Sequence, residues 1–474
     1  MILDKRADLR HGDVKKLLFS LSVPTITSQI VNMLYNLVDR VFIGHMQPAE
    51  TVGKLALTGV GVCLPIIMVI SAFASLMAIG GAPRASIAEG AGESEKSERI
   101  MGNCLTMLVI TALVLTVLFE SFAEPLLLMF GASENTIGYA LDYMRIYALG
   151  TIFVQLTLGM NAYITAQGFA TVSMKTVLIG ALLNTALDPL FIFVFHMGMA
   201  GAALATIIVL GLGVRGAALA TVISQAVSAV WVMTFLTGKK TRWYLKRENL
   251  HVDAKIVLPC IALGLSPFVM QSTESLIAIC FNSSLLRYGG DMAVGAMTIL
   301  TSVMQFAMLP LQGIGQGAQP ITSYNFGAKN TARVRETFRL LLKVCLIYSV
   351  SLWAFIELAP GLFARIFTPD AELIAFTTRV LRIYCAGLFL FGIQIACQMT
   401  FVSIGSALCS IIVAVLRKFV LLLPLIYLLP ALLSDRTTAV YLAEPVADVI
   451  AVTCTAILFA TQFRKALHKL EAGA

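Results

Sequence analysis

The chain has 474 residues, of which 58% are hydrophobic and only 13% are Asp, Glu, Lys or Arg. Soluble domains carry about 25% charged residues, so this composition excludes a soluble globular protein and predicts an all-α polytopic membrane protein. The formal net charge of +8 would suit a nucleic-acid-binding protein, but the positions of the basic residues along the chain indicate a role in membrane topology, and we expect no nucleic-acid partner.

Apolar runs of about 20 residues or more predict twelve transmembrane helices. Turn signals and charged residues separate these runs. We expect the helices near residues 14–44, 54–80, 100–122, 138–166, 170–195, 216–237, 254–287, 292–324, 337–358, 373–402, 406–430 and 438–462. The first run is too long for a signal peptide and lacks a small-residue cleavage site, so we expect no cleaved leader.

The basic residues favour alternate connecting segments. With a cytoplasmic N-terminus, the inside segments hold 24 basic residues, counting the pair Arg417 and Lys418, whereas the outside segments hold five. The positive-inside rule therefore predicts that both termini are cytoplasmic in a multi-pass protein of the cell membrane. It also predicts that residues 239–253 form a cytoplasmic linker.

The two halves of the chain repeat one unit. Gly90-Ala91 matches Gly327-Ala328, and Arg145-Ile146-Tyr147 matches Arg382-Ile383-Tyr384, in both cases at an offset of 237 residues. Each copy holds six predicted spans, an even number, so we expect two pseudo-symmetric six-helix bundles of the same orientation. The predicted division is an N-lobe at 1–238, the linker at 239–253 and a C-lobe at 254–474.

One short block occurs twice in the N-lobe. The sequence G-M-A-G-A-A-L-A-T at Gly198–Thr206 returns as G-V-R-G-A-A-L-A-T at Gly213–Thr221. The first copy keeps the register between the halves and the second breaks it. The region 198–221 therefore carries an extra block, to which the sequence assigns no function.

The first span carries a polar stripe. Gln29, Asn32, Asn36 and Asp39 are spaced by three or four residues, so they share one face of a helix. Pro24 lies upstream, where it can bend that helix. A carboxylate within an apolar span is costly unless it has a use. Asp39 is therefore a candidate functional residue, although a helix-end charge paired with Arg40 would also account for it.

Few other acids lie within the spans. Asp188 follows Asn184 by one turn and precedes Pro189, while Glu274, Glu444 and Asp448 belong to the second half. Each could simply join helices as a buried carboxyl group. For Asp39 and Asp188 the repeat argues against a purely structural role, because the residues at the equivalent positions of the second half, Asn282 and Leu423, are not acidic. These two acids occur in the N-lobe and have no acidic counterpart in the C-lobe. We therefore expect an ion site in the N-lobe, for H⁺ or for Na⁺ bound by oxygen ligands.

Polar and flexible side chains within the spans predict a substrate cavity. The candidates are Gln29, Asn32, Asn36, Gln271, Asn282, Met304 and Gln305. The five histidines lie at span ends or in loops, and no CxxC pair occurs. No nucleophile–base set or metal motif is therefore visible, and we expect neither an enzyme nor a cofactor.

These motifs together resemble the multidrug and toxic compound extrusion (MATE) family, of the DinF-like or MepA-like branch. The resemblance covers nearly the whole chain. It rests on the run from Pro24 to D-R-V-F-I-G (Asp39–Gly44), G-G-A-P-R-A-S-I, Asn184 with Asp188-Pro189, G-Q-G-A-Q-P-I-T-S-Y-N-F-G-A, and A-E-P-V-A-D.

The resemblance implies a fold, an activity and a site. The fold is twelve helices in two bundles, and the activity is export of small, often cationic and amphipathic drugs driven by entry of H⁺ or Na⁺. By position, the family's coupling site in the N-lobe would comprise Asp39, Asp188, Asn184, Asn161 and Tyr35, with Pro24 at the bend. A threonine joins this site and is either Thr206 or Thr221. An alternative acidic site of the C-lobe matches Glu274.

We therefore expect a monomeric antiporter in the lipid bilayer. The sequence leaves open the coupling ion, the substrate and the conformational state. The first alternative is a flippase or exporter of a lipid-linked or other amphipathic metabolite, which would favour a strongly basic cleft. The others are a membrane-embedded enzyme, which the missing nucleophile argues against, and a channel, which the pseudo-symmetry argues against.

Overall fold

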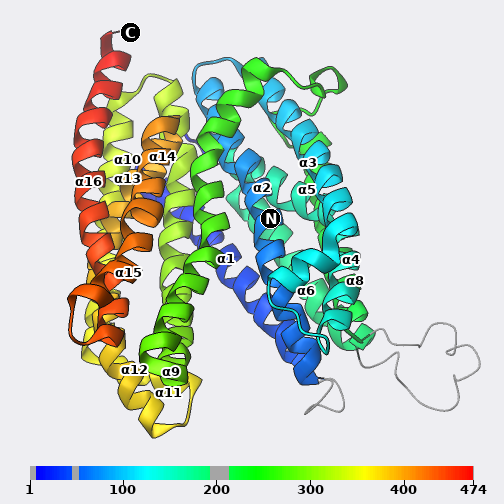
Figure 1. Cartoon of the computed structure of the whole chain (residues 1–474). Helices are drawn as coiled ribbons and strands as arrows, with labels where there is room; N and C mark the ends of the chain where they lie inside the picture. Colours follow the sequence, from blue (N-terminus) through cyan, green and yellow to red (C-terminus); the bar gives the residue numbers. More distant parts are fainter. Residues whose placement is uncertain (1–6, 45–52, 193–212, 473–474) are drawn as a thin grey trace, which may run out of the picture. The chain divides into compact units, whose positions relative to one another are not determined.

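The computed structural model describes residues 7–44, 53–192 and 213–472, and these residues are almost entirely helical, without strands. The N-terminal half contains α1 (Val14–Gly44), α2 (Lys54–Gly90), α3 (Ser94–Met129), α4 (Ile137–Leu149), α5 (Thr151–Ala166), α6 (Ala170–Ile192) and α8 (Gly213–Thr237). The C-terminal half contains η3 (Arg247–Asn249), α9 (Ala254–Gly327), α10 (Thr331–Leu358), α11 (Pro360–Phe367), α12 (Ala371–Tyr384), η4 (Cys385–Leu390), α13 (Phe391–Ser403), α14 (Ala407–Val415), η5 (Leu416–Leu422), α15 (Leu423–Leu432) and α16 (Arg436–Ala472). Figure 1 follows them along the chain.

The predicted number of membrane crossings agrees with the helices. In the described residues, ten helices are long and apolar enough to cross a membrane, and the pair α4 and α5, bent by 55°, raises the number to eleven. α9 has 74 residues and would be about 110 Å long if it were straight. It is broken at Gly290, where φ is 64°. Counting the two parts of α9, before and after this break, as separate membrane crossings raises the number from eleven to twelve.

The helices form two compact units, which we call unit 1 and unit 2. Unit 1 comprises Thr27–Ala82 and Glu95–Leu258, and unit 2 comprises Ala7–Ile26, Pro83–Ser94 and Pro259–Ala474. The first turns of α1 and the last turns of α2 therefore group with the C-terminal half. Within unit 1, α8 packs against α4, α5 and α6. Within unit 2, α16 packs against α13 and α15.

Unit 1 includes the segment predicted as the linker. Trp243 is 1% exposed. The Oε1 atom of Gln167 accepts hydrogen bonds from the Arg242 amide at 2.8 Å and from the Thr241 hydroxyl at 3.0 Å. Glu98 accepts a hydrogen bond from the Tyr244 amide and pairs with Lys246 at 2.7 Å, which raises the pKa of Lys246. The segment is thus fastened to α3 and to the end of α5.

A close helix crossing in unit 2 repeats the symmetry of the sequence. A Cβ atom on Gly90 of α2 would overlap the carbonyl oxygen of Tyr324 in α9, and a Cβ atom on Gly327 would overlap that of Ile87. Ile87 and Tyr324, like Gly90 and Gly327, are 237 residues apart. The two contacts are therefore equivalent under the sequence repeat, with each glycine packing against the same position of the other helix.

The first part of α1 also packs closely on α9. Cβ atoms on Gly313 would meet Ile26, and the Thr25 hydroxyl donates a hydrogen bond to the Gly313 carbonyl oxygen at 2.7 Å. Helix backbones can approach this closely where glycines face the neighbour. The segment that contains Pro24 is therefore held within unit 2, whereas Asp39, on the same helix, belongs to unit 1.

Candidate functional site

A small cavity lies within unit 1, between α1, α5, α6 and α8. Its volume is about 30 Å³, which is room for one or two water molecules. Most of the polar side chains that line it carry amide or hydroxyl groups. The lining includes Asn32, Tyr35, Thr157, Thr176, Asn184, Thr221, Ser224, Gln225 and Ser228.

Asn184 links the two sides of this site. Its Nδ2 atom donates to Asp188 Oδ1 at 3.3 Å and to Thr221 Oγ1 at 3.4 Å. Asn184 and Asp188 are four residues apart on α6, so they share a helix face, and both are buried. Thr221, from the second copy of the duplicated block, therefore contacts the predicted site. Thr206, with the first copy at Gly198–Thr206, lies outside the described residues.

Asp39 of α1 brings a second carboxylate toward Asp188. It is 8% exposed, and the two acids are close enough for mutual repulsion. Tyr35, one turn before Asp39, interacts electrostatically with both acids and lines the cavity. The structure thus places Asp39 of the first span near Asp188 within unit 1.

Several buried oxygens in this region have no hydrogen-bond partner among the described residues. They are Asp39 Oδ1, Asp188 Oδ2 and Asn184 Oδ1, together with Gln225 Oε1 and Ser224 Oγ. A buried polar atom without a partner costs free energy. A proton on a carboxylate, or a cation with oxygen ligands, would relieve this cost. The donor set therefore suits either H⁺ or Na⁺.

The remaining predicted N-lobe residues take different places. Asn161 does not line the cavity, and its side chain donates to the Ser173 carbonyl oxygen at 3.2 Å. Asn32 lines the cavity, whereas Asn36 is exposed and bonds back to the Asn32 carbonyl oxygen at 2.6 Å. Gln29 is half-buried.

Sequence reasoning missed Ser224, Gln225 and Ser228 of α8. They line the cavity together with Thr221 of the same helix. The signal was available, because V-I-S-Q-A-V-S places the two serines four residues apart with the glutamine next to the first.

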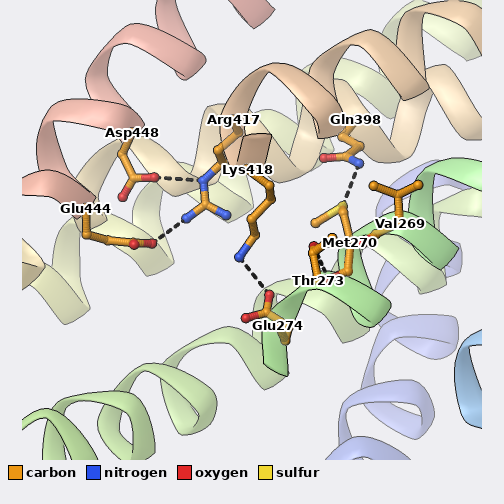
Figure 2. A network of polar contacts seen from close by, with 9 residues as sticks. All are labelled: Val269, Met270, Thr273, Glu274, Gln398, Arg417, Lys418, Glu444 and Asp448. Atoms are coloured by element: carbon orange, nitrogen blue, oxygen red, sulfur yellow. Dashed lines mark hydrogen bonds and ion pairs between the residues drawn. The ribbon is translucent and has the colours of Figure 1, made fainter. Parts of the chain in front are cut away.

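Unit 2 contains a separate network of charged groups, shown in Figure 2. Arg417 pairs with Asp448 at 2.7 Å and with Glu444 at 2.8 Å, and Lys418 pairs with Glu274 at 2.7 Å. The expectation that Arg417 and Lys418 lie in an inside connecting segment was wrong. They lie in η5, a π-helical segment within the span from α14 to α15, because acids on α9 and α16 neutralise them there.

Glu274 is thus bound to Lys418 in unit 2, while Asp39 and Asp188 belong to unit 1. The other predicted cavity residues of α9 vary in exposure. Gln271, Asn282 and Gln305 are exposed, and the sulfur of Met304 lies 3.8 Å from that of Cys385. No described contact joins these four residues into one site.

Comparison with known proteins identifies the family. The MatE family model matches residues 24–190 and 267–428, more than half of the chain. The chain is 24% identical over 444 residues to "Multidrug export protein MepA" of Staphylococcus haemolyticus, covering 93% of both chains. It is 22% identical over 420 residues to MepA of Staphylococcus aureus strain NCTC 8325, covering 88% of both.

Solved structures share the fold. A MATE crystal structure in a bent conformation matches with a TM-score of 0.88 at 21% identity, over 98% of this chain and 100% of the other. An outward-facing multidrug resistance MATE family transporter matches with a TM-score of 0.86 at 22% identity, over 98% and 99%. Because the family model covers both halves, including the segments that hold Asp39, Asp188 and Glu274, the chain belongs to the MATE family and is a multi-pass membrane transporter rather than an enzyme.

Proposed function

We propose that this transporter is an antiporter that exports drug-like, often cationic amphipathic compounds in exchange for H⁺ or Na⁺. The observation that carries the proposal is the pair of buried carboxylates, Asp39 and Asp188, beside a cavity in which three lining oxygens, on Asn184, Ser224 and Gln225, have no hydrogen-bond partner among the described residues. The MepA relatives are named multidrug export proteins, which supports the substrate class.

The ion would act by neutralising these carboxylates. Two negative charges in an apolar surrounding repel each other, so an empty site is costly and an occupied site is favoured. Binding from outside would draw α1 and α6 toward one shared ion. We propose that α1 then bends at Pro24 and that the change in the cavity releases the drug. A site at Glu274 would first have to displace Lys418, which makes it the weaker candidate.

Transport by the purified protein in liposomes tests the coupling site. We expect an imposed pH or Na⁺ gradient to drive ethidium movement, and Asp39→Asn and Asp188→Asn to reduce that flux at least tenfold. Asp142→Asn is the matched control, because Asp142 lies on α4 in an exposed pair with Arg215 at 2.7 Å. Full gradient-driven flux in both cavity variants would refute the assignment. Comparing the two gradients identifies the ion.

The alternative function is movement of a lipid-linked or other amphipathic metabolite. Arg417 and Lys418 are the observation in its favour, because they place two positive charges within a span. Three carboxylates offset them, however, which leaves this cluster without the net positive charge that an anionic lipid-linked substrate would require. Transport of ethidium but not of a fluorescent phospholipid would favour the antiporter.

A further inference from the structure

A groove in unit 2 lies between the start of α10 and the end of α16, the helix that runs to the C-terminus in Figure 1. Its volume is about 550 Å³. Phe338, Phe459 and Phe463 form its apolar part, and Arg339 and Arg464 are among the charged residues that line it. None of these residues belongs to the proposed coupling site.

The apolar part of the groove is firmly built. The Phe338 ring lies 4.4 Å from that of Phe459 and 5.4 Å from that of Phe463, and the rings of Phe459 and Phe463 are stacked at 4.7 Å. Phe459 and Phe463 are buried in the core cluster that α13 and α14 also join. These contacts hold the aromatic surface in place without any ligand.

The charged part of the groove carries an excess of positive charge. Arg335 pairs with Glu471 at 2.9 Å, whereas Arg339 and Arg464 form no ion pair within the part of the chain that the structure describes. Both side chains are exposed. Two arginines without ion-pair partners that line one groove from two helices are suited to bind a phosphate group.

Both helices change from charged to apolar at this groove. α10 begins T-A-R-V-R-E-T-F-R and continues L-L-L-K-V-C-L-I, while α16 changes in the opposite direction, from T-A-I-L-F-A to T-Q-F-R-K-A-L-H-K. Such a change marks the boundary between the hydrocarbon and the headgroups of a bilayer. Along α16, Phe459 lies five residues, about 7.5 Å, further into the apolar part of the helix than Arg464, whereas Phe338 and Phe463 adjoin the two arginines in the chain. The groove therefore reaches from headgroup depth at the arginines to hydrocarbon depth at Phe459.

We propose that this groove binds an anionic phospholipid. Its phosphate would bind between Arg339 and Arg464, and one acyl chain would run past the partly buried Phe338 and over the exposed Ala460. The order from the arginines to Phe459 along the groove matches the order of polarity within a lipid, which a soluble anion would not need. Basic sites between transmembrane helices commonly recognise anionic headgroups.

Native mass spectrometry of the full-length protein tests the site with phosphatidylglycerol and phosphatidylcholine as the probes. The protein should retain phosphatidylglycerol in preference to phosphatidylcholine, and the double variant R339Q/R464Q should lower phosphatidylglycerol retention at least fivefold. K465Q/K469Q is the matched control, because these lysines lie in the same charged end of α16 but do not line the groove. This control should retain the lipid as the unmodified protein does.

A second variant tests the groove with its charges intact. Ala460 is exposed and lines the groove, so Ala460→Trp should fill it and also lower phosphatidylglycerol retention. Thermal unfolding in detergent identifies any variant that fails to fold. If R339Q/R464Q does not fold, phosphatidylglycerol retention by Ala460→Trp tests the proposal. Unchanged retention in the folded groove variants, or an equal loss in K465Q/K469Q, would overturn the proposal.

Discussion

The buried charges of unit 2 show how a membrane helix can tolerate Arg417. Its side chain is 11% exposed, and Glu444 and Asp448 each accept one of its hydrogen bonds. An isolated charge at this depth would be costly, but paired charges with good geometry offset part of that cost. The i, i+4 spacing of the two acids on α16 places both on the face that meets η5. These acids therefore act here as partners of an arginine.

The neighbouring pair of Lys418 and Glu274 is asymmetric, and the asymmetry predicts the effect of mutation. The lysine side chain is 6% exposed, whereas the glutamate side chain is 53% exposed. Glu274→Gln leaves a buried ammonium without its partner, which costs about 3–5 kcal/mol. Lys418→Met leaves a carboxylate that water can reach. We therefore expect a clearly larger loss of thermal stability in detergent for Glu274→Gln than for Lys418→Met.

The double variant supplies the control for this prediction. Combining Glu274→Gln with Lys418→Met removes both charges, so its stability should return toward that of the unmodified protein. Equal destabilisation by the two single changes, or a double variant less stable than Glu274→Gln, would show that the pair does not behave as its burial indicates.

Spacing alone predicted which candidate residues share one face of a helix. Asp39 follows a polar stripe and Asp188 follows Asn184 by one turn, and the structure brings these residues toward one cavity. The sequence did not predict the buried position of Arg417, because adjacent basic residues usually mark a loop and because the acidic partners of Arg417 are 27 and 31 residues away. Nor did it distinguish Thr206 from Thr221, because the duplicated block gives the two an identical local sequence.

At the scale of elements, apolar runs predicted where helices cross the membrane better than where they end. The helix expected at 438–462 continues to Ala472, and the helix expected to start at 100 starts at Ser94. The added turns are rich in Lys, Glu, Arg and Ala, which favour helix without being apolar. In contrast, the gap expected between the spans at 254–287 and 292–324 contains the break in α9 at Gly290, since glycine adopts the positive φ found there.

The crossing of α2 and α9 makes its glycines essential for packing. A methyl group on Gly327 would overlap the backbone carbonyl of Ile87, which cannot move without shifting a helix. We expect Gly327→Ala to lower the thermal stability by several degrees or to abolish folded protein, as measured by size-exclusion chromatography and thermal unfolding. The symmetric change Gly90→Ala should act in the same way, since it would overlap the carbonyl of Tyr324.

Gly61 provides the matched control on α2. A Cβ atom there would meet nothing within 4 Å, and alanine is a better helix former than glycine by about 1 kcal/mol. Gly61→Ala should therefore be neutral or stabilising. A protein that tolerates Gly327→Ala as well as Gly61→Ala would show that α2 and α9 are not in close contact at this crossing.

For the whole molecule, the distribution of charge still predicts the orientation after the correction. Removing Arg417 and Lys418 from the 24 inside residues leaves 22, against five outside. The asymmetry therefore does not depend on the misplaced pair. An even number of crossings also requires the two termini to lie on the same side.

Reporter fusions in a bacterial host test this orientation. Green fluorescent protein should fluoresce when fused after Lys240 or after Ala472, and alkaline phosphatase should be inactive there, because we expect both points to be cytoplasmic. Phosphatase fused after Asp370, between α11 and α12, should be active. The reverse pattern at all three points would overturn the prediction. With the predicted pattern, the groove between α10 and α16 faces the inner leaflet, because that groove adjoins the C-terminal end of α16.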